Sequence, residues 1–479
     1  MRTVPPVADL SSSPRAVLRP LPLTAFTPDG GFWGPRLRQL REVTLRQQHE
    51  QCERTGRIDH FRRASGRKRI AEFVGRFYDD SDVYKWLEAC AYALALAPDP
   101  DLDALVDSVV DEIAAAQSSD GYLNTYFTFD RAAQRWDNLT RMHQLYCAGH
   151  LIQAGVAHHR ATGKRSLLDV ATRFADLICA TFTPSNRNTD GHEEIELALV
   201  ELYRHTRDRK YLDQSLLFLE WRGRGVLDGS QTFQDHLPVR EQREIVGHAV
   251  RATYLATGMA DACAEGTHNA LWTAVQALWS SAFERKAYVT GGLGAHWHGE
   301  SFGGDYELPN QRAYAETCAA IGGFFWNWRM LLLTGDARHA DWMETALYNG
   351  ILAGLSLDGT RYFYQNPLAS DGSHRRQEWF PTACCPPNIA RLLLSLPGYV
   401  ASRSPEGLWI HHYLPGELRV DGAAGRIETG YPRDGAVRVE VTQNAYPDRD
   451  ASMHLRIPGW CIDARVRVNG SALDVAAAP

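Results

Sequence analysis

The turn Thr162-Gly163-Lys164-Arg165-Ser166-Leu167-Leu168-Asp169 separates two long amphipathic patterns. Its glycine ends the first pattern, and the polar residues that follow open the second, as expected at a junction between two helices. Residues 206–213 and 334–341 form turns of the same character. The three turns begin 44 and then 128 residues apart, and the second interval is close to three times 43. This spacing predicts a repeated helical hairpin.

Amphipathic helical patterns continue almost without pause up to residue 397. Twelve helices are predicted, at residues 33–54, 82–97, 101–117, 138–161, 164–183, 191–206, 208–222, 244–265, 267–285, 311–334, 336–354 and 385–397. Six hairpins of this kind form either an open solenoid or a closed toroid. The irregular stretches between them favour a toroid with elaborated loops at one mouth. These stretches are residues 118–137, 223–243, 286–310 and 355–384.

After residue 405 the period of the pattern changes from that of a helix to two. The alternating segments are residues 408–411, 437–441, 453–457 and 464–468. Gly, Pro, Asp and Asn separate them, which predicts short antiparallel strands. We therefore expect a mainly α chain in three parts. They are a lead with one short strand at 1–30, a barrel of helical hairpins at 31–404, and a small or incomplete β-sandwich at 405–479.

The composition is that of an ordinary globular protein and excludes several functional classes. Of 479 residues, 44% are hydrophobic and 23% are charged, with a formal net charge of −6. No basic patch dominates, which argues against nucleic acid as the main partner; we interpret the basic run at 62–69 as a solvated loop. No apolar run approaches the roughly 20 residues that span a membrane, and the N-terminus lacks the apolar core of a secretory signal. Nine cysteines without a framework spacing fit a reducing compartment, so we expect a cytoplasmic location.

The adjacent cysteines Cys384 and Cys385, followed by two prolines, carry the main chemical signal. A trans peptide holds adjacent Cα atoms about 3.8 Å apart, below the usual disulfide range, which favours two free thiols. Together with Glu316 and Cys318 they supply four ligands that suit zinc. Glu316 and Cys318 cannot share one face of a regular helix, so they converge only where the backbone is non-helical, as at a helix start. Buried cysteines that act only as small hydrophobic residues are the alternative.

Other polar residues fall near the starts of alternate helices. In a toroid, alternate helices form an inner ring and run parallel, so their N-termini meet at one mouth. The residues near these starts are His143, His192, His248, Cys318, Cys384 and Cys385. Glu300 lies in a glycine-rich loop before one such helix. This loop is not a phosphate loop, because no strand precedes it and no Gly-Lys-Ser/Thr follows. Glu300 is therefore either a functional carboxylate or a capping or salt-bridged glutamate.

These motifs resemble those of glycoside hydrolase family 127, a family of retaining β-L-arabinofuranosidases. The matching stretches are residues 135–139, 143–150, 191–198, 247–251, 299–300, 314–318 and 383–388. The resemblance covers roughly residues 30–470. It implies an (α/α)6 barrel followed by β-sandwich material, in agreement with the helix count.

The resemblance also implies the roles of individual residues. Zinc is expected to bind Glu316, Cys318, Cys384 and Cys385, with Cys384 as the nucleophile and Glu300 as the general acid/base. The implied reaction is a double displacement in which a zinc-bound thiolate replaces the usual carboxylate nucleophile. If zinc were purely structural, Glu316 would be the alternative nucleophile.

The sugar pocket implied by the resemblance is lined by His143, His192, His248 and Tyr364. The expected function is release of terminal β-L-arabinofuranose from a small oligosaccharide or glycoconjugate. A non-hydrolytic sugar epimerase or isomerase is one alternative, because such barrels also use histidines and acids to move protons. A zinc-containing carbohydrate-binding protein is the other. Similar proteins continue into further β domains, so the sequence leaves the oligomeric state open.

Overall fold

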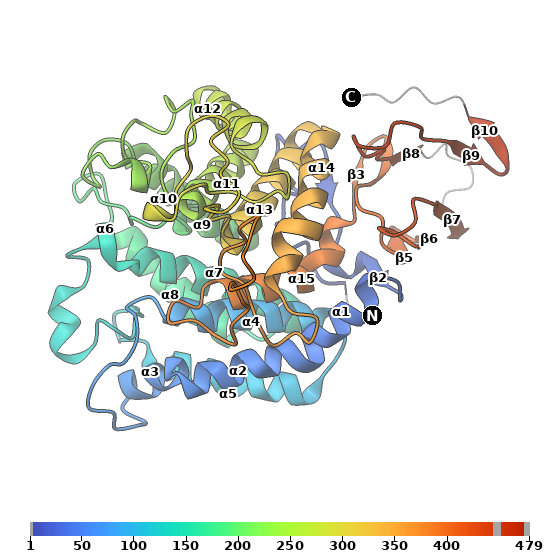
Figure 1. Cartoon of the computed structure of the whole chain (residues 1–479). Helices are drawn as coiled ribbons and strands as arrows, with labels where there is room; N and C mark the ends of the chain where they lie inside the picture. Colours follow the sequence, from blue (N-terminus) through green and yellow to red (C-terminus); the bar gives the residue numbers. More distant parts are fainter. Residues whose placement is uncertain (1–2, 444–451, 474–479) are drawn as a thin grey trace.

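The computed structural model describes residues 3–443 and 452–473. Six helices form an inner ring: α4 (Asp80–Leu96), α7 (Gln144–Thr162), α9 (Ile195–Thr206), α11 (Ala249–Glu265), α13 (Thr317–Thr334) and α15 (Cys385–Ser395) (Figure 1). Each of these helices packs against the next, and α15 packs back against α4. The ring is therefore closed, which confirms the predicted (α/α)6 barrel. No helix of the described ranges is long and apolar enough to cross a membrane.

An outer layer completes the hairpins. Its helices are α2 (Leu45–Arg54), α5 (Pro100–Ala116), α8 (Ser166–Thr181), α10 (Arg209–Trp221), α12 (Asn269–Ser280) and α14 (Ala337–Thr345). The short helix α1 (Trp33–Gln39) leads into α2, and α6 (Leu139–Met142) precedes α7. The first predicted turn joins α7 to α8, where Gly163 adopts a left-handed conformation with φ 81°. The third joins α13 to α14 through Gly335 with φ 73°.

Two details of the helix prediction are wrong. The basic run that we interpreted as a solvated loop begins inside a helix, α3 (Arg57–Ala64), where Arg62 pairs with Glu53 at 2.7 Å and with Glu112 at 3.3 Å. Helices α9, α11 and α13 begin several residues later than predicted, because the residues before them are extended rather than helical. These extended residues carry much of the candidate site.

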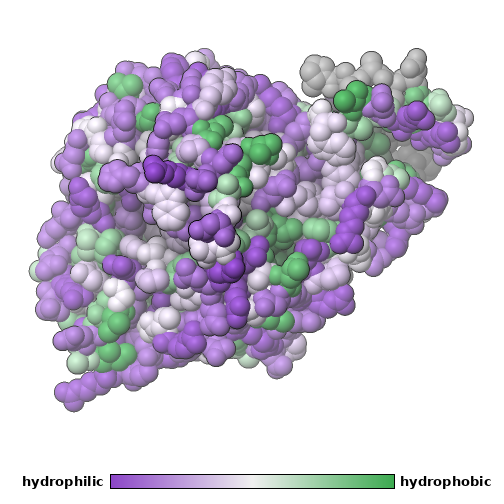
Figure 2. Space-filling view, viewed as in Figure 1, coloured by the Kyte–Doolittle hydropathy of each residue, from purple (hydrophilic) through white to green (hydrophobic). Residues whose placement is uncertain are grey.

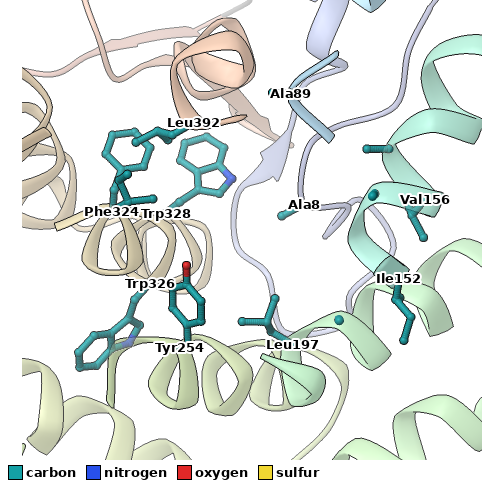
Figure 3. Close-up of a cluster of buried hydrophobic side chains, with 14 of the residues drawn as sticks. Ala8, Ala89, Ile152, Val156, Leu197, Tyr254, Phe324, Trp326, Trp328 and Leu392 are labelled. Atoms are coloured by element: carbon teal, nitrogen blue, oxygen red, sulfur yellow. The ribbon is translucent and has the colours of Figure 1, made fainter. Parts of the chain in front are cut away.

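The N-terminal lead closes one end of the barrel. The Val17 amide donates to the Leu332 carbonyl at 2.9 Å, and Arg160 Nη1 donates to the Pro6 carbonyl at 3.1 Å. Both partners lie near the C-terminal ends of inner helices, so the lead covers the mouth opposite the helix starts. Ala8 is buried among side chains of the ring, including Ile152 (Figure 3). The lead was predicted only as a Pro-rich segment with a short strand.

Short strands follow the barrel and pack beside α14 (Figure 1). They are β3 (Ala401–Ser404), β4 (Gly407–Ile410), β5 (Gly416–Val420), β6 (Ala423–Thr429), β7 (Val437–Gln443), β8 (Ser452–Leu455), β9 (Val466–Val468) and β10 (Ser471–Leu473). Together with β1 (Arg19–Pro20) and β2 (Phe26–Pro28) of the lead they form two sheets with the orders β1-β3-β4-β8 and β2-β5-β6-β7, and β9 pairs with β10. All pairs are antiparallel, as predicted, except β4 with β8, which is parallel. Residues 444–451 and 474–479 of the predicted β module lie outside the described residues.

Two strands of these sheets come from the other end of the chain. β1 (Arg19–Pro20) pairs with β3, and β2 (Phe26–Pro28) pairs with β5. The β module is also fixed to α14, because Arg456 pairs with Asp341 at 2.5 Å and Trp460 Nε1 donates to Glu344 at 3.0 Å. The visible face of the barrel is mostly hydrophilic, with only scattered apolar side chains (Figure 2).

Candidate active site

The starts of the inner helices meet at the mouth of the ring opposite the N-terminal lead. The residue at the N-cap position is His143 in α7, His248 in α11, Glu316 in α13 and Cys384 in α15, and His192 lies three residues before α9. These five residues line one cavity of about 760 Å³. The structure therefore brings together groups that lie far apart in the sequence, as the toroid predicted.

Glu300 stands on one wall of this cavity. The Phe302 amide donates to the Gly247 carbonyl at 2.9 Å, which fixes the glycine-rich loop against the start of α11. Glu300 Oε2 consequently lies 2.7 Å from His248 Nε2. Burial raises the pKa of the Glu300 carboxyl, but hydrogen bonds from His248 and Tyr314 outweigh burial and lower the pKa below its usual value. Glu300 thus faces the cavity as a hydrogen-bonded carboxylate, and it caps no helix.

Three histidines form the neighbouring part of the wall. The ring centroids of His143 and His192 are 5.3 Å apart, and those of His192 and His248 are 5.9 Å apart. Burial lowers the pKa of all three rings, so they are neutral at neutral pH. The Nδ1 atoms of His143 and His248 are buried and have no partner in the described protein. A neutral imidazole both donates and accepts a hydrogen bond, which suits sugar hydroxyls.

Three thiols and a carboxylate form a compact cluster on the opposite wall. The Sγ atoms of Cys318 and Cys385 are 3.2 Å apart, and those of Cys384 and Cys385 are 3.9 Å apart. Glu316 Oε1 lies 3.6 Å from the Cys384 sulfur and 3.7 Å from that of Cys385. Glu316 has an extended backbone (φ −62°, ψ 136°), so it reaches the same point as Cys318. This agrees with the prediction that Glu316 and Cys318 converge only where the backbone is non-helical.

The cluster has the dimensions of a tetrahedral metal site. Bonds of about 2.3 Å to sulfur place neighbouring ligand atoms about 3.8 Å apart, and the observed separations are 3.2–3.9 Å. Oε2 of Glu316 is buried without a partner. Burial raises the pKa of the Cys318 thiol, but hydrogen bonds from the other two thiols lower it to about 6, whereas burial raises the pKa of Glu316 and Cys385. A bound cation would lower the pKa of Glu316 and of the thiols and so allow all four groups to ionise.

The structure distinguishes Tyr364 from its neighbour Tyr362. The Thr317 amide donates to the Tyr364 carbonyl at 2.9 Å and ties this loop to the start of α13. Tyr364 Oη then lies 3.1 Å from the Cys384 sulfur. Tyr362 is fully buried elsewhere, and its hydroxyl donates to Gln47 at 2.8 Å. Tyr364 therefore lines the cavity, and Tyr362 does not.

Three further residues of the cavity were not assigned a role from the sequence. Tyr314 hydrogen-bonds Glu300, and Trp297 packs edge-on against Tyr314 at 5.3 Å between ring centroids while remaining half exposed at the rim. Arg251 lines the cavity one helical turn after His248. That spacing of three residues was a signal in the sequence, because it places both side chains on one face of α11. The two aromatic residues carried no comparable pattern.

Comparison with known proteins agrees with this geometry. The family described as "Beta-L-arabinofuranosidase, GH127 catalytic domain" matches residues 27–398, and the "GH127 middle domain" matches residues 407–479. The chain belongs to glycoside hydrolase family 127. The family 127 catalytic match contains the whole cavity described above.

Individual relatives within family 127 are similar over long stretches. A non-reducing end beta-L-arabinofuranosidase of Bifidobacterium longum subsp. longum is 38% identical over 432 residues, 81% of this chain and 66% of the relative. The chain therefore spans slightly less than two thirds of that relative's length. A solved GH127 beta-arabinofuranosidase has a TM-score of 0.92 at 39% identity, covering 97% of this chain and 78% of its own. A GH127 beta-L-arabinofuranosidase from Geobacillus stearothermophilus T6 has a TM-score of 0.88 at 42% identity, covering 94% and 77%.

Gly247 is required where the glycine-rich loop meets α11. Its φ is +75°, and a Cβ atom there would lie 1.9 Å from the Gln231 carbonyl oxygen. Gly225 has a similar φ of +77° but nothing within 4 Å, so Gly225→Ala controls for backbone strain alone. We expect Gly225→Ala to lower the free energy of unfolding by about 1 kcal/mol and Gly247→Ala by about 1–3 kcal/mol more. Chemical denaturation measures both; equal losses would contradict the close packing at Gly247.

Proposed function

We propose that the chain is a retaining, exo-acting glycoside hydrolase that releases terminal β-L-arabinofuranose from small oligosaccharides or glycoconjugates. Membership of family 127 supports hydrolysis of a glycosidic bond, and the arabinofuranosidase activity named for its relatives supports the sugar. The N-terminal lead covers the far end of the barrel, which supports a blind pocket that admits a chain end. Such a pocket suits terminal rather than internal residues.

The observation that carries this proposal is the short distance between the two walls. Carboxylate oxygens of Glu300 and Glu316 lie within 4.8 Å of each other, and the Cys384 sulfur is 3.6 Å from Glu316. Inverting glycosidases keep about 6.5–9.5 Å between their catalytic groups to admit a water, whereas retaining enzymes keep about 5–5.5 Å. The spacing of Glu300 and Glu316 is below the range of inverting enzymes, which supports direct attack on the anomeric carbon by a side chain of the Glu316–Cys384 cluster, with retention of configuration.

The proposed reaction proceeds in two displacements. In the first, the Cys384 thiolate attacks the anomeric carbon, the bond from that carbon to the leaving oxygen breaks, and Glu300 donates its proton to that oxygen. In the second, Glu300 removes a proton from water, the water oxygen bonds to the anomeric carbon, and the carbon–sulfur bond breaks. The first step needs protonated Glu300, and exclusion of water by the bound sugar favours that form. Tyr364 holds the sulfur in position from 3.1 Å.

We infer that Glu316, Cys318, Cys384 and Cys385 bind zinc. Tetrahedral sites rich in thiolates favour zinc, and the ligand separations fit its bond lengths. When bound, zinc would keep the thiols ionised at neutral pH and withdraw charge from sulfur. Glu316 stays the alternative nucleophile, because it is the other anionic group facing Glu300 at this distance.

We also propose that the protein works in a reducing compartment, with the cytoplasm as the expected location. All nine cysteines are free thiols. Three of them belong to the proposed metal site, where oxidation to a disulfide would remove ligands. A reducing compartment preserves such a site.

Glu300→Gln tests the acid/base assignment. The amide cannot donate a proton, so hydrolysis of a β-L-arabinofuranosyl disaccharide should fall about 10²–10⁴-fold. The loss should be smaller for the first step with a 4-nitrophenyl leaving group, which needs little protonation. Glu307→Gln, in the same loop but exposed, is the matched control and should keep wild-type rates. Wild-type activity in the Glu300 variant would refute the role, and an inverted product anomer detected by NMR would refute retention.

Metal content tests the zinc assignment. Elemental analysis of the purified chain should give one zinc per molecule, because four ligand atoms converge at one point. Cys318→Ser and Cys385→Ser should each lower that occupancy, whereas Cys179→Ser, a half-buried cysteine on α8, should leave it unchanged. A metal-free preparation with full activity would contradict a zinc-dependent reaction.

Covalent trapping tests which side chain attacks the sugar. A mechanism-based arabinofuranose electrophile should label Cys384, because this thiol lines the cavity whereas Cys385 is fully buried behind it. Peptide mass spectrometry locates the label. A label on Glu316 would instead support a carboxylate nucleophile beside a structural metal ion.

A further inference from the structure

A fully buried lysine stands behind the thiol cluster with few partners of its own. Lys85, on α4, has 0% of its surface exposed. Its ammonium group donates one hydrogen bond, at 2.7 Å to the Tyr146 hydroxyl. The nearest carboxylate oxygen, on Asp82, is 3.9 Å away, and Asp82 already accepts from Arg57 at 2.8 Å. A buried ammonium with so little compensation is unfavourable unless another negative charge lies near it.

Tyr146 connects this ammonium to the active-site cavity. It is in the first turn of α7, and it lines the cavity together with Cys318 and Cys384. Its hydroxyl oxygen accepts from Lys85, and within the described part of the chain its own proton has no acceptor. Helix α4, which carries Lys85, packs against both α7, which carries Tyr146, and α15, which begins at Cys385. One hydrogen bond therefore connects the buried ammonium to a side chain that lines the same cavity as the thiols.

Within the described chain, the other basic groups around the thiol cluster are uncharged or lie near a carboxylate. The surrounding histidines are neutral. Arg391, on α15, forms an ion pair with Glu88 at 2.9 Å. Arg251 lies on the Glu300 side of the cavity, where the charge of Glu300 acts on it. Among the described residues, Lys85 is thus a fully buried cation beside the cluster that no carboxylate pairs closely. Glu194 is a further buried carboxyl that the charge of Lys85 reaches, but burial raises the pKa of Glu194 to about 8, so this carboxyl is mostly uncharged at neutral pH. The Lys85 ammonium lacks a close negative charge, and the thiol cluster lacks a close positive charge.

We propose that Lys85, through Tyr146, is a positioning residue that balances the charge of the metal site. The inference rests on the proposed zinc site: four ionised ligands carry four negative charges against two on zinc, which leaves an excess of two negative charges. In a buried position this excess weakens the binding of zinc to fully ionised ligands. The Lys85 ammonium reduces the excess without occupying a ligand position, and the Tyr146 hydroxyl carries its polarisation to the sulfur atoms.

The test is the zinc affinity of four variants, measured by competition with a chromogenic chelator. Lys85→Met keeps the chain length of the side chain but removes its charge, and zinc affinity should fall about 10–100-fold, as when outer partners of metal ligands are removed. Lys85→Arg restores the charge and should recover most of the affinity. Tyr146→Phe keeps the charge but breaks the connection, and affinity should fall by less than in Lys85→Met.

Lys286→Met is the matched control. Lys286 is also a buried lysine, but it pairs with Glu244 at 2.7 Å and donates to the Ile245 carbonyl at 3.0 Å, away from the thiols. This variant can lose stability but should keep wild-type zinc affinity. Should Lys85→Met fail to fold, Tyr146→Phe and Lys85→Arg decide the question, because the proposal requires a loss in the first and near-normal binding in the second.

Three results would overturn the inference. Unchanged zinc affinity in a folded Lys85→Met variant, or in Tyr146→Phe, would show that the charge does not act on the site. An equal loss in Lys286→Met would show that affinity follows general stability instead of local charge. If the wild-type chain itself binds no zinc, the proposed metal site fails as well, and this outcome is distinguishable because it precedes any comparison of variants.

Discussion

Closure of the inner ring is the constraint on which the site depends. Because α15 packs against α4, six parallel helices share one mouth, and their N-terminal ends converge there. At a helix start the backbone leaves helical geometry and its unpaired amides favour negative charge. Glu316 and Cys384 occupy such caps on neighbouring helices, although 68 residues separate them in the sequence. The toroid thus gathers anionic groups on the wall of one cavity.

Much of the barrel was predictable from the sequence, because long amphipathic helices and polar turns leave a clear periodic signal. The parts that were missed lack such a signal. One short strand was predicted in the lead, whereas the structure has two; β1 has two residues and β2 has three, too few for alternation to place them. The N-terminal lead has no regular structure over most of its length, and its burial follows from the shape of the barrel end. Helix α3 was misread because charged residues dominate it, while Ile58 and Phe61 pack inward.

The sequence predicted which residues belong to the candidate site better than it predicted how they contact one another. The adjacent cysteines and the polar residues at alternate helix starts indicated a shared mouth, and the structure brings them into one cavity. The choice of Tyr364 over Tyr362 depends on backbone pairing between a loop and α13, which no local pattern encodes. Lys85 was visible as the one basic residue of a helix that also carries three acidic residues. Its relation to thiols more than two hundred residues away appears only when α4, α7 and α15 lie together.

The pairing of both chain ends in the same sheets has a consequence for biosynthesis. β1 and β2 leave the ribosome first, yet their partners β3 and β5 are made only after all fifteen helices. Until then the lead is held only by contacts with the ends of inner helices, such as that of Arg160 with the Pro6 carbonyl, and the ring itself cannot close before α15 is made. Contacts between such distant segments form late, since the entropy of closing the intervening chain opposes them. The nascent chain therefore exposes apolar surface of its ring until α15 has been made, a period in which a chaperone is best placed to bind it.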